Sequence, residues 1–407
     1  MLTGLGDMRK GFALALALMG LGAMTPAVTP SALAQQNQDP FGGQFGAWEI
    51  ALPPKDAGED IARMSDALAK LPPQRPGVVD TYVLSVSLWN EPVFENEARE
   101  AANVLARRYD AAERTIVLSA GRGQGIARTF PSFSPNNFNA ALGRIGKLAD
   151  PNEDLVIVFI TSHGSPDGNV VAQEKGRLMG GIRAINLRTS LQQAGIRTKL
   201  LLISACFAGN YILPFSNDDT VVLTAAAADK TSFGCAPQRD WTYFGDAMFN
   251  HALRGGEGII DAFNMARGII TKWENDLHAE WAAKSASQRA QEQEPQPSNP
   301  QQNVGDHALE VIAKAESYGQ SIACAAHLSF ALDRARTGRP IKGLTDIASL
   351  TNAQSAAQSR AATEGQARGR SPQDTAKAIA AASASTLQLY PAQSADITQL
   401  ATSCMAP

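Results

Sequence analysis

Five short apolar stretches recur in the central part of the chain, each bounded by polar or turn-forming residues. They are TYVLSVSL (residues 81–88), RTIVLSA (114–120), DLVIVFITSH (154–163), TKLLLISAC (198–206) and DTVVLTAAA (219–227). Their aliphatic and β-branched residues follow one another almost without interruption, as in strands that are buried on both faces. The pattern therefore predicts five strands of a mostly parallel sheet.

Between these strands, apolar residues recur every three to four positions, which is the period of an amphipathic helix. The segments are ENEAREAANVLARRYD (95–110), NNFNAALGRIGKLA (136–149) and NLRTSLQQAG (186–195), followed after the fifth strand by YFGDAMFNHALRG (243–255) and a long helix over about 258–289. Parallel strands joined by helices form right-handed crossovers. We expect an α/β fold of the α/β/α sandwich type, with helices on both faces of the sheet.

The regions on either side of this central part differ from it in composition. Residues 35–77 are rich in Gln, Pro and Gly and predict a linker with one short helix near 62–71. The main domain is expected over 78–318, with a Pro- and Gln-rich loop at 291–306. Residues 319–407 are rich in Ala and poor in aromatic residues. We expect them to form a small α-helical appendage, packed on the main domain or partly disordered.

The first 34 residues predict an export signal. Arg9 and Lys10 precede the apolar run GFALALALMGLGAM, and Ala32 and Ala34 have the spacing of a signal-peptide cleavage site. The run is shorter than the about 20 apolar residues of a membrane-spanning helix, which argues against an anchor. We therefore expect an exported protein, periplasmic or secreted, without a membrane span once residues 1–34 are removed.

Composition narrows the possible partners. Lys and Arg total 36 against 39 Asp and Glu, which gives a net charge of −3. The chain therefore has no excess of basic residues with which to hold nucleic acid or an anionic membrane by electrostatics alone. Peptides, proteins and small molecules remain as expected partners.

Export would change the redox state expected for the four cysteines, because free thiols tend to pair in an oxidising compartment. Cys324 and Cys404 flank the C-terminal region and are candidates for a disulfide. Cys235 is interpreted as a buried structural thiol, since no second Cys or His stands at metal-ligand spacing. The sequence also lacks a glycine-rich phosphate loop, so we expect neither a cofactor nor a metal.

Two reactive side chains end successive predicted strands. His163 follows LVIVFITS and Cys206 follows LLLISA. Ligands of open α/β sheets bind at the carboxyl ends of the strands, so both side chains are expected at the same rim. An imidazole beside a thiol can take its proton or stabilise the thiolate. The pair therefore predicts nucleophilic catalysis by Cys206.

The residues next to this pair fit acyl transfer. Gly164 has no β-carbon to obstruct a substrate carbonyl, and its N–H together with that of Cys206 is a candidate oxyanion hole. A helix beginning after Cys206, at FAGNYI, would favour a thiolate through its dipole. A single cysteine after a strand is most often an inert core residue. The joint placement of His163 and Cys206 favours the catalytic interpretation.

Five motifs of the chain resemble the legumain (asparaginyl endopeptidase) family of cysteine peptidases, and most closely its bacterial branch. They are FITSHGSPDG (159–168), LISACFAGNYI (202–212), LTAAAADKTSFGC (223–235), DWTYFGDAMF (240–249) and SNPQQNVGD (298–306). They occur in the family's order within about residues 78–315. The resemblance implies a caspase-like fold, and it places His163 and Cys206 at the positions of the family's catalytic dyad.

The resemblance also identifies candidate substrate-binding residues. It places Asp246, and Thr231 or Ser232, at positions of the pocket for the residue before the scissile bond. Ser204 stands where the family has an acidic residue two positions before the nucleophile.

The basic pair with which the family reads Asn or Asp is not kept. Glu95 and Asn96 stand where an Arg and a His would be. Because Glu95 and Asp246 are both acidic, a basic side chain before the scissile bond is at least as strong an expectation as Asn or Asp.

The sequence thus predicts an exported cysteine endopeptidase that acts on a peptide or protein through a Cys/His dyad. Two alternatives stay open. An acyl-enzyme can be intercepted by an amine instead of water, which would make the protein a transpeptidase or transamidase. In the other alternative, a non-catalytic envelope protein uses the same cleft only to bind peptides.

Overall fold

The computed structural model describes residues 48–49, 52–123, 126–390 and 393–405. The predicted export signal at residues 1–34 and the first part of the expected linker lie outside the described residues.

The centre of the structure is a six-stranded sheet with the strand order β3-β2-β4-β7-β8-β9. The strands are β2 (Thr81–Ser87), β3 (Thr115–Ser119), β4 (Leu155–Thr161), β7 (Lys199–Ser204), β8 (Thr220–Thr224) and β9 (Gln301–Val304). The first five are parallel to their neighbours, and β9 joins one edge in the antiparallel sense. The five strands predicted from the apolar pattern are confirmed.

Both faces of the sheet are buried, because alternate residues of a strand face opposite layers. In β4, Val156 and Val158 belong to one apolar cluster, whereas Leu155 and Ile157 belong to another. All seven residues of β4 are buried. This burial on both sides is why the strand sequences show no alternation of apolar and polar residues.

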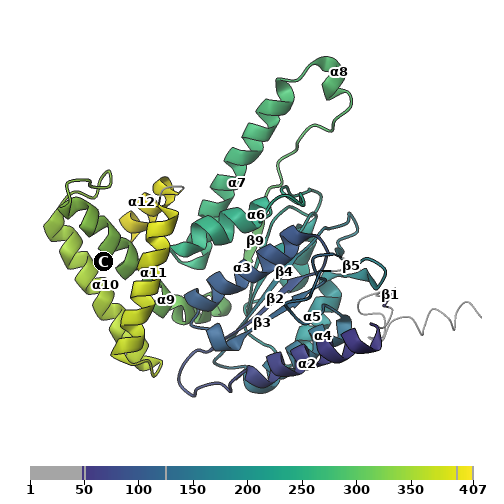
Figure 1. The fold of residues 1–407 in the computed structure, drawn as a ribbon, viewed down its shortest axis with the longest axis horizontal. Helices are drawn as coiled ribbons and strands as arrows, with labels where there is room; N and C mark the ends of the chain where they lie inside the picture. Colours follow the sequence, from purple (N-terminus) through teal and green to yellow (C-terminus); the bar gives the residue numbers. More distant parts are fainter. Residues whose placement is uncertain (1–47, 50–51, 124–125, 391–392, 406–407) are drawn as a thin grey trace, which may run out of the picture. The chain divides into compact units, whose positions relative to one another are not determined.

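Helices cover the two faces of the sheet (Figure 1). One layer contains α2 (Pro54–Lys70), α4 (Pro135–Leu148) and α5 (Ala184–Gln193), and the other contains α3 (Pro92–Arg108), α7 (Ile259–Ala282) and the first half of α9 (Asp306–Arg336). The predicted α/β/α sandwich with a mostly parallel sheet is therefore confirmed.

Helix α2 is longer than the short helix expected near residues 62–71. It begins at Pro54, a residue whose fixed φ suits the first turn of a helix. Met64 is buried in the apolar cluster on this face of the sheet, and so is Leu71, which follows the helix. The later part of the expected linker is therefore packed structure.

A hairpin that the sequence did not predict follows β4. Strands β5 (Val170–Glu174) and β6 (Leu178–Ile182) pair antiparallel, and β1 (Trp48–Glu49) pairs with β6 in the same small sheet. These strands are short and partly exposed, and β6 contains two glycines in the stretch LMGGI. Such a sequence has weak strand propensity, so the hairpin depends on its tertiary contacts.

Two further segments differ from expectation. The helix expected over 243–255 is divided into α6 (Tyr243–Gly245), a π-helical segment η4 (Asp246–His251) and the 3₁₀ turn η5 (Ala252–Arg254). The long helix expected to reach 289 ends with α7 at Ala282 and is followed by the short α8 (Ala286–Arg289). The expected loop at 291–306 contains β9, which lacks an apolar run and forms by pairing with β8.

The C-terminal region is helical, as expected, and contains its own apolar core. It comprises the second half of α9, α10 (Ile347–Ala367), α11 (Pro372–Leu389) and α12 (Ser394–Ser403). The core includes Leu328, Leu332, Leu350 and Ile397. A disulfide between Cys324 and Cys404 ties α9 to the end of α12. The boundary expected at residues 318 and 319 falls inside the continuous helix α9.

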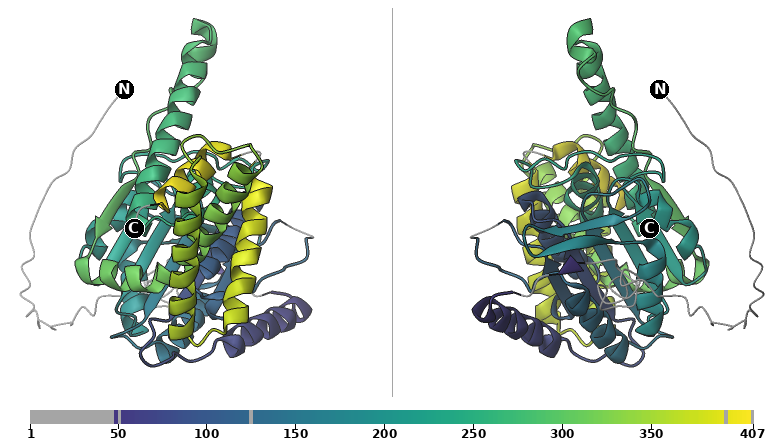
Figure 2. Two further views of the ribbon diagram at one scale, coloured as in Figure 1. Left: turned by 90° about the vertical axis from the view of Figure 1, so that its left-hand side faces the viewer. Right: turned by 90° about the vertical axis from the view of Figure 1, so that its right-hand side faces the viewer.

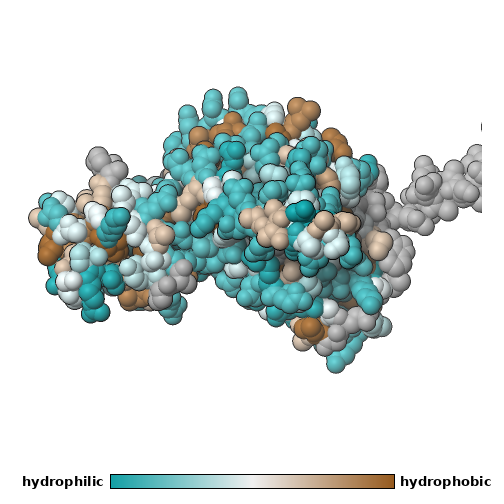
Figure 3. Space-filling model, turned by 90° about the horizontal axis from the view of Figure 1, so that it is seen from above, coloured by the Kyte–Doolittle hydropathy of each residue, from teal (hydrophilic) through white to brown (hydrophobic). Residues whose placement is uncertain are grey.

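Helix α7 extends beyond the sheet and its helices in all three ribbon views (Figures 1 and 2). On the face shown in Figure 3, hydrophilic residues predominate and apolar residues occur in small separate groups. Among the described residues, no helix has the length and apolarity needed to cross a membrane.

Candidate active site

The sheet brings His163 and Cys206 to the same rim. Strands β4 and β7 are neighbours, and Thr161 is aligned with Ser204, the last residue of each strand. The Ser162 amide donates a hydrogen bond to the Ser204 carbonyl at 3.1 Å, which continues the pairing beyond the strands. His163 and Cys206 each follow this last aligned pair by two residues.

Gly164 packs directly against the backbone of Cys206. A β-carbon built on Gly164 would lie 1.9 Å from the Cys206 carbonyl oxygen and 3.1 Å from the Cys206 nitrogen. No real β-carbon approaches a backbone oxygen so closely, so this position requires glycine. The glycine therefore lets the loop that carries His163 close onto the loop that carries Cys206.

The N–H of Gly164 is turned away from the hairpin beside it. Gly164 opposes Val170 in an antiparallel bridge, with hydrogen bonds from Ser165 to Asn169 and from Val171 to His163 on either side. A residue in such a non-hydrogen-bonded pair directs its N–H outward. Within the part of the chain that the structure describes, neither this N–H nor that of Cys206 has a hydrogen-bond partner.

The backbone presents Cys206 at a sharp turn. Phe207 has a left-handed conformation with φ of 59°, and its amide donates to the Lys230 carbonyl at 2.7 Å. The Cys206 thiol is partly exposed, and the Ser232 amide donates to its sulfur at 3.3 Å. The sulfur also lies 3.7 Å from the Ser232 carbonyl oxygen, so the backbone of Ser232 fixes the position of the thiol.

The prediction of a helix after Cys206 is wrong. Residues Ala208–Tyr211 form a 3₁₀ turn, η2, which is followed by a second short turn at Leu213–Phe215. The left-handed Phe207 cannot belong to a right-handed helix, so the chain reverses at this point. The contact with the Cys206 sulfur therefore comes from the Ser232 amide rather than from the start of a helix.

Aromatic side chains hold the His163 ring. Trp89 and Phe94 both meet it edge to face, with centroid distances of 4.9 and 5.0 Å. Glu91 places Oε2 3.6 Å from His163 Nε2, and the indole N–H of Trp89 donates to Glu91 Oε1 at 3.3 Å. The imidazole is therefore held between two aromatic side chains and a carboxylate.

Of the predicted pocket residues, Ser232 contacts Cys206, whereas Thr231 beside it is exposed. Ser204 is buried, and its hydroxyl lies 3.1 Å from that of Thr242.

The two predicted acidic pocket residues both have cationic partners. Glu95 is buried, accepts a hydrogen bond from Ser119 at 2.7 Å and lies 3.4 Å from Arg122. Asp246 lies 3.5 Å from Arg239 and 3.6 Å from His251. Burial raises the pKa of Asp246, but its hydrogen bonds and these cations together hold that pKa below its usual value. Each carboxylate is therefore neutralised within the protein.

Glu97 is a buried carboxyl without such a cation. Its side chain lies beneath the ends of β4 and β7 and accepts a hydrogen bond from the Thr242 amide at 2.8 Å. The other oxygen, Oε1, is buried without a hydrogen-bond partner among the described residues. Burial raises the pKa of Glu97 to about 7, although the Thr242 amide and nearby hydroxyl groups, including that of Ser204, lower it.

The sequence reasoning did not single out Glu91 or Glu97. One signal for Glu97 was present, since it shares a helical stripe with Ala101 and Val104, both buried. A charged residue inside an apolar stripe is unusual and indicates a special role.

Cys235 lies in the same region and is partly buried. Burial, together with negative charge at Cys206, raises its pKa well above the usual value. Cys235 therefore stays a neutral thiol. Among the described residues, no group of three or more His, Cys, Asp or Glu side chains is arranged to hold a metal ion.

Residues 132–290 match the model of the Peptidase C13 family. This part of the chain is therefore similar to legumain-type cysteine peptidases. The match includes both His163 and Cys206, and the resemblance to the legumain family is confirmed. The crystal structure of caspase-1 from Spodoptera frugiperda is also similar, with a TM-score of 0.38 and 11% identity over 58% of this chain and 93% of that chain. No curated protein matches the chain.

Proposed function

We propose that this legumain-type peptidase is an exported endopeptidase in which Cys206 is the nucleophile and His163 the general base and acid. The observation that carries the proposal is the packing of Gly164 on the Cys206 backbone, which brings the two loops into direct contact. The partly exposed thiol, the loop that carries His163 and the two amides without hydrogen-bond partners among the described residues lie at one rim of the sheet.

Each step of hydrolysis has a group suited to it. The Cys206 thiol gives its proton to His163, and the sulfur attacks the peptide carbonyl. The N–H groups of Gly164 and Cys206 stabilise the oxyanion of the tetrahedral intermediate. His163 then donates the proton to the leaving amine, which leaves a thioester. Water, deprotonated by His163, hydrolyses the thioester and releases the new carboxylate.

The surroundings of His163 support this role. Trp89 and Phe94 restrict the orientation of the ring, and Glu91 stabilises the imidazolium that forms when the thiol loses its proton. In this proposal Glu91 is a positioning residue, because it acts on the substrate only through His163.

The pocket is proposed to accept a basic residue before the scissile bond, with Asn or Asp as the alternative. Glu91, Glu95, Glu97 and Asp246 belong to the elements around the dyad or to the predicted pocket. Asn96, in the position of one of the family's basic residues, donates to Asp240 at 3.1 Å. Glu95 and Asp246 already have cationic partners within the protein and Glu97 is buried, so charge complementarity with a cationic substrate group rests on Glu91, whose side chain is partly exposed beside His163.

Export is part of the proposal, and two features support it. The N-terminal sequence has the pattern of a signal peptide. The disulfide between Cys324 and Cys404 is of a kind that persists in oxidising compartments.

The catalytic assignment is tested by labelling with an electrophilic peptide probe. We expect one label at Cys206, lost in Cys206→Ala and strongly reduced in His163→Ala. Cys235→Ala is the matched control and should be labelled like the wild type. Labelling at Cys235, or undiminished labelling in His163→Ala, would contradict the dyad.

Paired reporter peptides that differ only by Lys or Asn before the scissile bond test the specificity. We expect cleavage after Lys to be at least as efficient as after Asn. Efficient cleavage after Asn alone would exclude a preference for basic residues and would leave the dyad assignment intact.

A further inference from the structure

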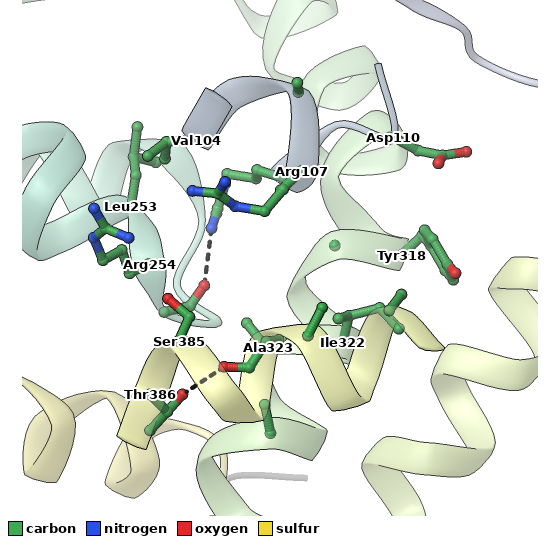
Figure 4. Close-up of a pocket in the computed structure, with 18 of the residues that line it drawn as sticks. Val104, Arg107, Asp110, Leu253, Arg254, Tyr318, Ile322, Ala323, Ser385 and Thr386 are labelled. Carbon is green, nitrogen blue, oxygen red and sulfur yellow. Dashed lines mark hydrogen bonds between the residues drawn. The ribbon is translucent and has the colours of Figure 1, made fainter. Parts of the chain in front are cut away.

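A cavity of about 470 Å³ lies between the peptidase domain and the C-terminal helices (Figure 4). It is lined by the end of α3, by η5 and by the facing sides of α9 and α11. A volume of this size accommodates a small organic ligand, and such sites are often found between domains. None of the residues described around Cys206 lines this cavity.

Small apolar residues form much of the cavity wall. They are Ala323 and Ala326 of α9 and Ala378 and Ala382 of α11. Two larger apolar residues, Ile322 and Leu389, also line the cavity. Short side chains on two facing helices leave space that longer side chains would fill. The wall is thus suited to an aliphatic chain.

Arg107 brings an unpaired positive charge to this cavity. Its guanidinium has no hydrogen bond or ion pair with any residue that the structure describes. Its neighbour Arg108 differs, since it is buried and bonded to Glu316 and to the carbonyls of Gly255 and Glu257. The five N–H donors of Arg107 therefore remain available to a ligand.

Arg254 adds a second cation at the same end of the cavity. Figure 4 shows Arg107 and Arg254 near one another, away from Tyr318. Arg254 donates from Nε and one terminal nitrogen to Asn250, at 2.8 and 3.1 Å. Burial, and then the charge of Arg107, lower the pKa of Arg254 to about 10. The two guanidinium groups thus repel each other, and an anion between them would relieve the repulsion.

The carboxylates near the two arginines are engaged elsewhere. Glu100 pairs with Arg99 at 2.9 Å. Asp110, which also lines the cavity, is held by Arg370 and lies 3.7 Å from Arg75. The third, Asp374, accepts a hydrogen bond from the hydroxyl of Ser371 at 2.7 Å at the start of α11. Among the described residues, no acidic side chain forms an ion pair with Arg107 or Arg254.

We propose that this cavity binds a monocarboxylate that carries an aliphatic chain. The carboxylate would lie between Arg107 and Arg254, where planar guanidinium groups bind it through paired hydrogen bonds. The chain would extend along the alanines of α9 and α11. A fatty acid and the C-terminal end of an apolar peptide share this chemistry.

The site is separate from the proposed catalytic centre. Helix α3 begins beside His163, where Phe94 meets the ring, and ends at the cavity with Arg107. The 13 residue steps from Phe94 to Arg107 correspond to about 20 Å at the helical rise. Binding of a ligand in this cavity is therefore independent of the proposed peptidase mechanism.

Calorimetric titration of the full chain with decanoate, below its micelle concentration, tests the proposal. We expect decanoate to bind saturably at one site. Decanol lacks the carboxylate and acetate lacks the aliphatic chain, so each should bind at least about tenfold more weakly. Acetylated peptides of Ala and Leu, with a free or an amidated C-terminus, form the second arm. Binding of the free-acid peptide without decanoate would identify a peptide terminus as the source of the carboxylate.

Variants locate the site. Arg107→Gln should weaken binding at least about tenfold, because a charged hydrogen bond is lost. Ala323→Phe should abolish it by filling the cavity, with folding verified by the melting temperature. Arg188→Gln, which removes an exposed arginine of α5, is the matched control and should bind as the wild type does. The proposal is overturned if decanol binds as tightly as decanoate, if Arg107→Gln has no effect, or if no carboxylate binds.

Discussion

A β-carbon on Gly164 would lie 1.9 Å from the carbonyl oxygen of Cys206. The glycine and the cysteine belong to loops that follow different strands, so their contact fixes how the two loops meet.

Replacement of Gly164 by Ala tests the importance of this contact. We expect the free energy of unfolding to fall by about 1–3 kcal/mol, because the loops must separate to admit the methyl group. Peptidase activity should fall by more than tenfold, since a shift of about 1 Å in the reacting groups is costly. The measurements are urea unfolding and kcat/KM with a reporter peptide.

Gly143→Ala is the matched control for this substitution. Gly143 lies inside α4, and a β-carbon there meets no atom within 4 Å. The alanine should leave activity unchanged and stabilise the helix by about 0.5–1 kcal/mol. Equal effects of the two substitutions would contradict a special contact at Gly164.

The buried carboxyl of Glu97 predicts a loss of stability with rising pH. Its pKa is about 7 in the folded protein and near the usual 4.5 in the unfolded chain, so between these values the folded state keeps a proton that the unfolded state has lost. The free energy of unfolding should therefore fall as pH rises from about 4.5 to about 7, by up to about 3 kcal/mol. Glu97→Gln should remove this dependence.

Urea unfolding at pH 4.5, 6 and 8 measures the Glu97 effect as the difference between wild type and variant. Glu59→Gln, at an exposed position of α2, is the control. A constant difference between wild type and Glu97→Gln at all three pH values would show that Glu97 does not titrate in this range.

His251 joins the π-helical segment to α12 through two carboxylates, Asp246 and Asp396. Burial lowers the pKa of His251, but the two carboxylates raise it to about 9, above the usual 6.5. The folded state therefore holds an extra proton between these values, and its stability should decrease as pH rises from about 6.5 through about 9. The protection factors of the α12 amides, which correct for the base-catalysed intrinsic exchange rate, should fall over this range.

His251→Asn should remove the pH dependence of the α12 protection factors, whereas His278→Asn, at an exposed position of α7, should not. If the α12 protection factors are the same at pH 6.5 and pH 9.5, the His251 link contributes nothing to the docking of α12.

The disulfide between Cys324 and Cys404 joins residues 80 positions apart. Closing such a long loop restricts the unfolded chain, so Cys404→Ser should lower the free energy of unfolding by about 2–4 kcal/mol. Dithiothreitol should lower the melting temperature of the wild type but not that of Cys404→Ser. Cys235→Ser serves as the control, and its melting temperature should still respond to dithiothreitol.

The sequence predicted those parts of the fold that burial dictates. The strands around His163 and Cys206 are apolar throughout because both sheet faces are covered, and this pattern is visible without a structure. The ends of β4 and β7 then follow from the parallel order of the strands. The hairpin β5–β6 was missed because its residues are partly exposed and include glycines, so the surrounding structure determines its conformation.

The surroundings of the dyad could be predicted only in part. Ser232 was expected near the site from its motif, and its amide does reach the Cys206 sulfur. Glu91 and Glu97 approach the rim from α3 and the turn before it, and their contacts depend on how that helix crosses β4 and β7. Crossing geometry results from side-chain packing across the whole layer, and no local motif encodes it.

Helix α9 contributes to two apolar cores along one unbroken backbone. Ala308 and Ile312 of its first half pack in the core of the sheet, whereas Leu328 and Leu332 of its second half pack among the C-terminal helices. A helix is cooperative along its length, so fraying of one half removes support from the other. The peptidase domain and the C-terminal helices should therefore melt in a single transition. Truncation of the chain within α9 would destabilise the peptidase domain as well as remove the C-terminal helices.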